Sequence, residues 1–308
     1  MNWKINIILI VVLFWSCQDV KVTKANDLEI GSIIDVSTLK KYLDEPQVKL
    51  IDFRKKEDYR KGHIPGAINL WRTDIEDASF PYGGMMASRQ QIESLFQNLG
   101  INSEDTIIVY DDRGMCESAR LWWVLKNYNF KNIKLLNGGI SAWMEIKGSL
   151  DTLTPVLKPT VFKLTENHGM EHYISKENLL RSLGTNVTII DTRSEDEFSG
   201  KLLKNGAKRA GRIPGSIHLD WANSIDYHGS KKLKSYDDIE LIYNKLNIKK
   251  TDSIILYCHS GVRSAHTTFV LSELLGYENV MNYDGSWTEW SHFDDLPIEN
   301  DHITKTKN

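Results

Sequence analysis

Cys258 combines a nucleophilic side chain with surroundings that can activate it. It follows an apolar run, Ser253 to Tyr257, and precedes a stretch with helical periodicity, Ala265 to Leu275. This order places a thiol at the end of a buried strand and beneath a helix N-terminus, where unpaired N–H groups and the helix dipole favour negative charge. Arg263 adds a permanent cation. Because the thiolate and not the thiol attacks, the pattern predicts an activated nucleophile beside an anionic substrate. The loop reads Cys258-His259-Ser260-Gly261-Val262-Arg263-Ser264.

The small number of cysteines also favours a reactive thiol. The chain has three, Cys17, Cys116 and Cys258, too few for a disulfide framework. Unpaired thiols are unusual in exported proteins, and the start of the chain predicts export. At least one of the two thiols other than Cys17 is therefore expected to react. For Cys116 we favour the role of a partly buried small hydrophobe.

The start of the chain predicts export. Lys4 precedes an apolar run, Ile5 to Trp15, that is too short to span a bilayer comfortably, and Ser16-Cys17 follows. A cysteine in this place resembles the lipobox of bacterial lipoproteins, in which the cysteine is acylated. We therefore expect an exported protein, periplasmic or membrane-anchored through a lipid on Cys17. An uncleaved anchor and a plain cleaved signal are the alternatives.

The rest of the chain contains an internal repeat. Residues 50–54 match residues 189–193, each with an Asp-x-Arg motif, and both copies continue with Ile-Pro-Gly. Further on, Ile101 to Trp143 aligns with Ile248 to Trp290 without a gap. The repeat predicts a duplicated domain, with extra residues in the second copy around Gly200 to Arg209.

Length and charge agree with two domains of ordinary size. The chain has 308 residues, and its net charge of −3 gives no reason to expect nucleic acid as a partner. The connector is rich in Pro, Thr and Lys and has no sustained periodicity, which indicates an extended linker. We divide the chain into a signal and lipid-tether segment (1–27), a first domain (28–150), a linker (151–172), a second domain (173–300) and a polar tail (301–308).

Each copy has the pattern of an α/β domain. Short β-branched runs alternate with helical patterns, which is typical of a parallel sheet covered by helices on both faces. Ligands of such sheets bind beyond the carboxyl ends of the strands, where Cys258 falls. The expected strands are Val48–Asp52, Thr106–Tyr110, Ile133–Leu136, Val187–Asp191, Ser253–Tyr257 and Asn279–Tyr283.

Together these motifs resemble those of the tandem-domain rhodanese sulfurtransferases, the thiosulfate and mercaptopyruvate sulfurtransferase family. The resemblance covers about Leu28 to Ile298 and is strong in the stretch from Tyr283 to Trp290. It implies two tandem rhodanese-like domains, of which the second carries the nucleophile and the first is catalytically silent. This chain agrees, because Asp111 aligns with Cys258 and an aspartate cannot accept a sulfane sulfur.

By this resemblance Cys258 takes the outer sulfur of a small sulfur-donor anion, holds it as a persulfide and passes it to a thiophilic acceptor such as cyanide or a thiol. No metal or organic cofactor is implied. Successive N–H groups of the loop would form an anion-binding nest, so residues 259–264 are candidate substrate-binding residues. Arg263 is expected to clamp the donor anion. Arg193 is a further substrate-binding candidate, although we favour a structural ion pair with Asp191.

Two departures from the family pattern bear on the donor. The basic residues that often follow the cysteine in thiosulfate enzymes are absent here, and Ser260 resembles the hydroxyl of mercaptopyruvate enzymes. Against this, Arg263 stands where those enzymes commonly have threonine, and Glu197 stands where many relatives have a substrate-binding arginine. Loss of that arginine argues against a carboxylate-bearing donor. We therefore predict thiosulfate as donor and keep mercaptopyruvate as the alternative.

Two other classes of function compete with this one. Phosphatases of related folds use a cysteine and a following arginine, but their loops are one residue longer, and no general-acid aspartate occurs inside this loop. A non-catalytic sulfur carrier or binding module is the second alternative, and the intact Cys258, Gly261 and Arg263 argue against pure binding. The sequence therefore favours an enzyme.

Overall fold

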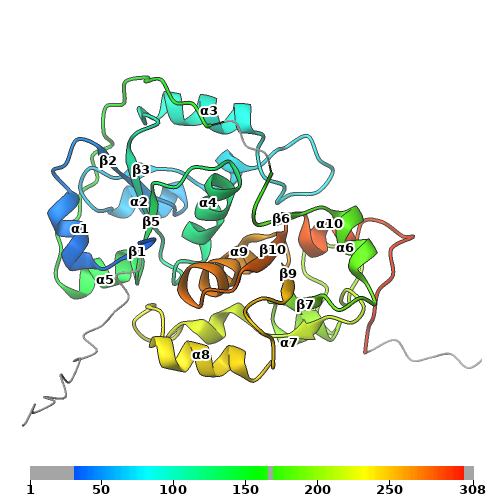
Figure 1. Ribbon diagram of the computed structural model, residues 1–308. Helices are drawn as coiled ribbons and strands as arrows, with labels where there is room; N and C mark the ends of the chain where they lie inside the picture. The colour runs from blue at the N-terminus through cyan, green and yellow to red at the C-terminus, as the bar shows by residue number, and fades with distance from the viewer. Residues whose placement is uncertain (1–30, 166–168, 302–308) are drawn as a thin grey trace, which may run out of the picture.

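The computed structural model describes residues 31–165 and 169–301 and contains two α/β domains (Figure 1). The first domain is built on a five-stranded parallel sheet in the order β1-β5-β4-β2-β3. Its elements are β1 (Ile33–Ile34), α1 (Val36–Tyr42), β2 (Val48–Asp52), α2 (Lys56–Lys61), β3 (Ile68–Asn69), α3 (Arg89–Asn98), β4 (Thr106–Tyr110), α4 (Cys116–Asn127), β5 (Ile133–Leu136) and α5 (Gly139–Glu145), with a 3-10 turn at Arg72–Ile75.

The second domain repeats this plan, with the corresponding strands in the order β6-β10-β9-β7-β8. The prediction of two tandem parallel α/β domains is therefore confirmed. The elements are β6 (Tyr173–Ile174), α6 (Lys176–Ser182), β7 (Thr188–Asp191), α7 (Glu195–Phe198), β8 (Ile217–His218), α8 (Tyr236–Asn244), β9 (Ser253–Tyr257), α9 (Val262–Phe269), β10 (Asn279–Tyr283) and α10 (Ser286–Trp290), with a 3-10 turn at Trp221–Ser224.

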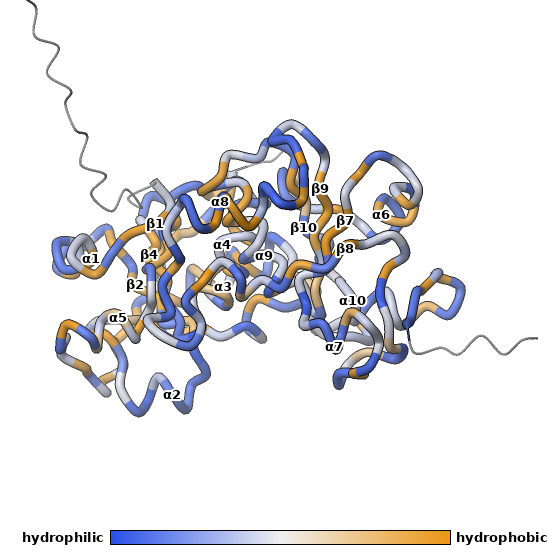
Figure 2. The backbone as a smooth tube through the Cα atoms, turned by 90° about the horizontal axis from the view of Figure 1, so that it is seen from below, coloured by the Kyte–Doolittle hydropathy of each residue, from blue (hydrophilic) through white to orange (hydrophobic). Residues whose placement is uncertain are grey.

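Helices cover both faces of each sheet because strand side chains alternate between the faces. In the first sheet, Ile107 and Val109 pack with α3 and α4, whereas Ile108 and Tyr110 pack with α1 and α5. The second sheet has α8 and α9 on one face and α6 and α10 on the other. Apolar residues gather along the central strands (Figure 2). Their burial, at roughly 25 cal/mol per Å² of apolar surface, drives the assembly of these layers.

The two domains share one apolar core. Helices α4 and α9 lie against each other between the two sheets (Figure 1). Trp122 of α4 meets Phe269 of α9 edge to face, with ring centroids 5.0 Å apart, and Trp122 and Trp123 are fully buried. The helix that follows Cys258 is therefore packed against the first domain.

The expected helix after Cys258 differs in detail. It begins at Val262, and its last part, Val270–Leu274, is a π-helix. The hydroxyl of Thr268 donates to the carbonyl of Ser264, and that of Ser272 donates to the carbonyl of Thr268. Such side-chain bonds compete with regular α-helical pairing.

The segment between the domains contains no helix or strand from residue 152 to residue 165. The proposed signal segment with Cys17 and residues 302–308 of the expected tail lie outside the described residues. Among the helices that are described, none has the length and apolar character to cross a membrane.

Candidate active site

Cys258 lies between the carboxyl end of β9 and the N-terminus of α9, and it is 1% exposed. We call residues 258–264 the active-site loop. The N–H groups of Cys258 and Gly261 both donate to the hydroxyl of Ser286, at 3.1 and 3.0 Å. Ser286 therefore anchors the loop from α10. Our sequence analysis did not include this contact. A signal for it exists in the repeat, because the gapless alignment places Gly139 opposite Ser286, so only the second domain has a hydroxyl at this position.

Gly261 shapes the active-site loop. Its φ of 72° lies in the left-handed region, and an added Cβ would come within 2.6 Å of the Asp284 carbonyl. Its N–H is taken by Ser286, and its carbonyl accepts from the Asn282 side chain at 3.1 Å. Both of its backbone groups are thus engaged within the protein, so its expected contact with the donor stays a prediction.

The surroundings of Cys258 favour its thiolate. Burial alone raises the pKa of this thiol, but the charge of Arg263, the hydroxyl and N–H of Ser264 and the N–H of Ser260 lower it, and the net pKa falls below its ordinary value. The Ser264 hydroxyl is buried and has no other partner in the described part of the chain. Two of the loop N–H groups and one hydroxyl are therefore available to a negative charge on the sulfur.

Arg263 is held by a carboxylate of its own domain. Its guanidinium donates to both oxygens of Glu197, at 2.7 and 2.8 Å, in a bidentate pair. The side chain of Arg263 is 16% exposed and that of Glu197 is 4% exposed. Burial raises the pKa of Glu197, but the hydrogen bonds and charge of Arg263 outweigh it and bring the pKa to about 2. The arginine expected to clamp the donor thus already carries a carboxylate, and its clamping role stays a prediction.

This pair predicts a pH-dependent contribution to stability. The pKa of Glu197 is about 2 in the folded protein against an ordinary value of 4.5, so its ionised form stabilises the fold above pH 4.5 and loses that effect as the pH falls toward 2. The shift corresponds to about 3 kcal/mol. Glu197→Gln should therefore be less stable than the wild type at neutral pH, and the difference should shrink over this acidic window. Urea unfolding of both proteins across that range checks this; a difference that does not change with pH would contradict it.

His259 faces the protein and not the solvent. It is 9% exposed, and its Nε2 lies 2.9 Å from the carbonyl of Asn205. Burial, followed by the charge of Lys204, lowers its pKa to about 4, so the ring is neutral at neutral pH. Since a carbonyl can only accept, Nε2 carries the proton.

Two residues of the active-site loop, Ser260 and Val262, lie against the first domain or in the core that the domains share. An added Cβ on Gly84 of the first domain would come within 2.8 Å of the Ser260 Cβ, so the first domain touches the loop here. Val262 is 4% exposed and belongs to the shared apolar core. The first domain therefore helps to shape the site even though its own loop carries no nucleophile.

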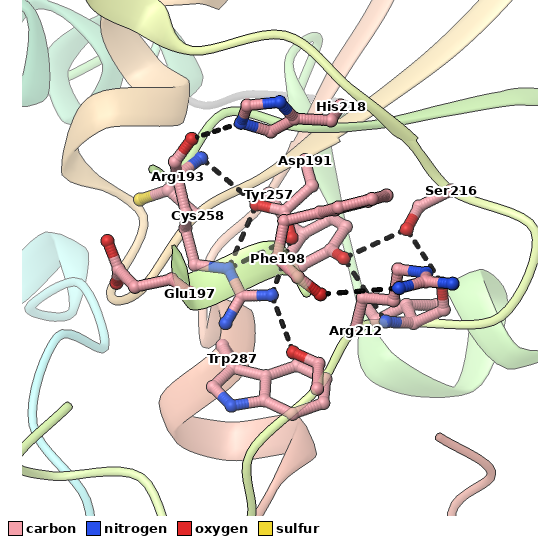
Figure 3. A network of polar contacts seen from close by, with 12 residues as sticks. Asp191, Arg193, Glu197, Phe198, Arg212, Ser216, His218, Tyr257, Cys258 and Trp287 are labelled. Carbon is pink, nitrogen blue, oxygen red and sulfur yellow. Dashed lines mark hydrogen bonds and ion pairs between the residues drawn. The ribbon is translucent and has the colours of Figure 1, made fainter. Parts of the chain in front are cut away.

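Arg193 and Asp191 form a buried ion pair. Arg193 Nε lies 2.9 Å from both carboxylate oxygens, and the guanidinium also donates to the Gly211 carbonyl at 2.7 Å. The guanidinium stands 4.7 Å from the Trp287 ring centroid, beneath Cys258 in Figure 3. Arg193 is 1% exposed. This geometry supports the structural alternative that we favoured, while a direct contact of Arg193 with the donor remains a prediction.

The corresponding loop of the first domain already holds an anion. The carboxylate of Asp111 accepts from the N–H groups of Arg113, Met115 and Ser118 at 2.8, 3.0 and 2.8 Å, and from the Ser118 hydroxyl at 3.0 Å. A carboxylate thus fills the first-domain counterpart of the active-site loop. Because the two loops align without a gap, this cradle demonstrates on the protein itself that such a loop binds negative charge.

Cys116 has the surroundings of an inert thiol. It is 2% exposed within the shared core. Burial, and then the charges of Glu117 and Asp111, raises its pKa well above the ordinary value. It therefore has little thiolate character, as expected for a small hydrophobe.

Comparisons with known proteins agree with this architecture. The family model described as Rhodanese-like domain matches residues 35–146 and 175–293. The chain is 32% identical to the sulfur carrier protein TtuD of Thermus thermophilus, over 86% of this chain and 95% of that protein. It is also 32% identical to a thiosulfate sulfurtransferase of Corynebacterium glutamicum, over 89% and 92% of the two chains.

A solved structure shows the same fold. SseA from Escherichia coli, described as a 3-mercaptopyruvate sulfotransferase with the rhodanese fold, superposes with a TM-score of 0.73 at 26% identity and covers 83% of this chain and 98% of its own. Two matched domains and full-length relatives above 30% identity leave one assignment: this chain belongs to the rhodanese family, with two Rhodanese-like domains in tandem.

Proposed function

We propose that this protein is a sulfurtransferase that moves the outer sulfur of thiosulfate to a thiophilic acceptor through a persulfide on Cys258. One observation carries the proposal. Cys258 is the thiol of lowered pKa, and it lies at a helix N-terminus beside Arg263 and the Ser264 hydroxyl. The relatives named as thiosulfate sulfurtransferases support the same reaction class.

The proposed reaction has two displacement steps. First, the Cys258 thiolate attacks the outer sulfur of thiosulfate; the S–S bond of the donor breaks and sulfite leaves with the electron pair. The enzyme then holds a persulfide anion. Second, cyanide or a thiolate attacks the terminal sulfur, the persulfide bond breaks, and the Cys258 thiolate is restored. No net oxidation occurs, and such a sequence gives ping-pong kinetics.

The engagement of Arg263 supports thiosulfate over mercaptopyruvate. Glu197 occupies both arms of this guanidinium, so Arg263 has no free pair of donors with which to hold the carboxylate of mercaptopyruvate in a bidentate contact. Mercaptopyruvate remains the alternative, because SseA carries that name at 26% identity.

A donor comparison tests the proposal. The purified protein is given thiosulfate or mercaptopyruvate with cyanide, and thiocyanate is followed. Turnover with thiosulfate is expected, and turnover with mercaptopyruvate alone would reverse the choice of donor. A protein that takes up one sulfur without turnover would instead be a carrier, as the name of the Thermus relative suggests.

We also propose that the protein is exported and held at a membrane by a lipid on Cys17. The apolar run from Ile5 to Trp15 before this cysteine supports the proposal. Cells that express the chain and are fed a labelled fatty acid should label the protein in the membrane fraction. Cys17→Ala should remove both the label and the membrane association; label that persists in this variant would overturn the proposal.

A further inference from the structure

The second domain carries an insertion that the first domain lacks. Between Phe198 and Arg212 the chain runs ten residues longer than between the counterparts Tyr59 and His63. We call residues 200–209 the insertion loop. Since the two domains are otherwise built alike, a segment present only beside the nucleophile calls for a role in the reaction.

The insertion loop is fixed against the active-site loop. The Asn205 carbonyl lies 2.9 Å from Nε2 of His259, the neighbour of the nucleophile. The Lys208 N–H donates to the Ser291 hydroxyl at 3.0 Å. These contacts attach the insertion loop to the site at Asn205, the neighbour of Lys204, and at Lys208.

Lys204 carries a positive charge in the insertion loop, next to the residue that contacts His259. Its ammonium group has no hydrogen bond or ion pair within residues 31–165 and 169–301, whereas Lys201 of the same loop pairs with Asp196 at 3.2 Å. Lys204 is an exposed residue. Partial desolvation of its ammonium group, and then the charge of Arg263, lower its pKa, while Glu197 and Cys258 raise it. Lys204 thus interacts electrostatically with the nucleophile and with both members of the ion pair.

The charged side chains already described near the nucleophile do not neutralise the charge of the donor. The bidentate contact of Arg263 with Glu197 makes that pair neutral as a whole. Thiosulfate carries two negative charges, and the sulfite that leaves is also anionic. A further positive charge near the donor would strengthen its binding, and an ammonium on a flexible stem can supply such a point charge.

We propose that Lys204 is a donor-binding residue, whose ammonium group contacts the sulfonate oxygens of thiosulfate and thereby turns the outer sulfur toward Cys258. The inference rests on the proposed function and adds the residue that replaces the substrate-binding arginine lost at Glu197. On this proposal, the role of the insertion loop is to place Lys204 beside the bound donor.

The test separates the two half-reactions in the full chain. Lys204→Met removes the charge and keeps most of the stem; Lys201→Met is the matched control in the same loop. Rapid mixing with thiosulfate measures persulfide formation, and mixing of the preformed persulfide with cyanide measures its discharge. Lys204→Met should raise the KM for thiosulfate about ten- to a hundredfold, the effect of losing a hydrogen bond to a charged group. Discharge, the urea midpoint and Lys201→Met should stay close to the wild type, and Lys204→Arg should restore most of the binding.

Three results would overturn it. An unchanged KM in Lys204→Met, equal losses in both half-reactions, or equal effects of Lys204→Met and Lys201→Met would each remove Lys204 from donor binding. These results differ from a failure of the proposed function, which would show as a wild-type protein that does not react with thiosulfate.

Discussion

Replacing Cys258 by serine is expected to reduce sulfur transfer to the background of the assay, a loss of at least about 10⁴-fold by analogy with the removal of other enzymatic nucleophiles. A serine hydroxyl has no comparable anion at neutral pH and forms no persulfide. Because Cys258 is buried and similar in size to serine, both domains should remain folded. Thiocyanate formation and the mass of the donor-treated protein measure the two consequences.

Cys116→Ser is the matched control. This thiol is also buried, but its pKa is raised and its domain holds Asp111 at the nucleophile position. Transfer by Cys116→Ser should stay within about a factor of two of the wild type, since it makes no proposed bond to sulfur. Equal loss of transfer in both variants would contradict the assignment of the reaction to the second domain alone.

Arg120→Met is expected to destabilise the protein by about 3–5 kcal/mol, the usual cost of removing one partner of a buried ion pair. Arg120 belongs to α4 of the first domain, yet its guanidinium lies 2.6 Å from the Asp284 carboxylate of the second. The two side chains are 0% and 2% exposed. The same guanidinium donates to the carbonyls of Gly84, at 2.6 Å, and Gly261, at 3.4 Å. Its loss would leave a buried carboxylate without its cation next to the active-site loop.

Urea unfolding measures this effect. Lys232→Met provides the control, because its pair with Glu145 also joins the two domains but has side chains that are 41% and 48% exposed, so it is expected to contribute less than about 1 kcal/mol. Arg120→Met should also lower sulfur transfer, because the Gly261 carbonyl loses a donor. A loss of stability no larger than that of the control would show that the interdomain ion pair is not required.

The sequence predicted much of the fold because the relevant signals are local. The β-branched runs of the six central strands lie in the interior of both sheets, and five of the six strands begin and end at the predicted residues. The sixth, β7, begins at Thr188, one residue later than expected. The edge strands β1, β3, β6 and β8 have only two residues each, too few for any period to be visible in the sequence.

The candidate site was predictable only in part. The thiol, its strand and its helix follow one another along the chain, so their order could be read directly. Contacts between distant segments could not be read in this way. Ser286 reaches the loop from α10, Arg120 from the other domain, and the insertion reaches it through the Asn205 carbonyl.

The family, the duplication and the position of the nucleophile can be read from the sequence, since they depend on residue order and on strand and helix periods. Which charges meet at the thiol depends on the tertiary structure. Arg263 was expected to face a donor anion, and folding placed the Glu197 carboxylate on it, 66 positions away along the chain. The physical reason is that electrostatic interactions depend on distance and burial in space, and neither quantity can be obtained from separation along the chain.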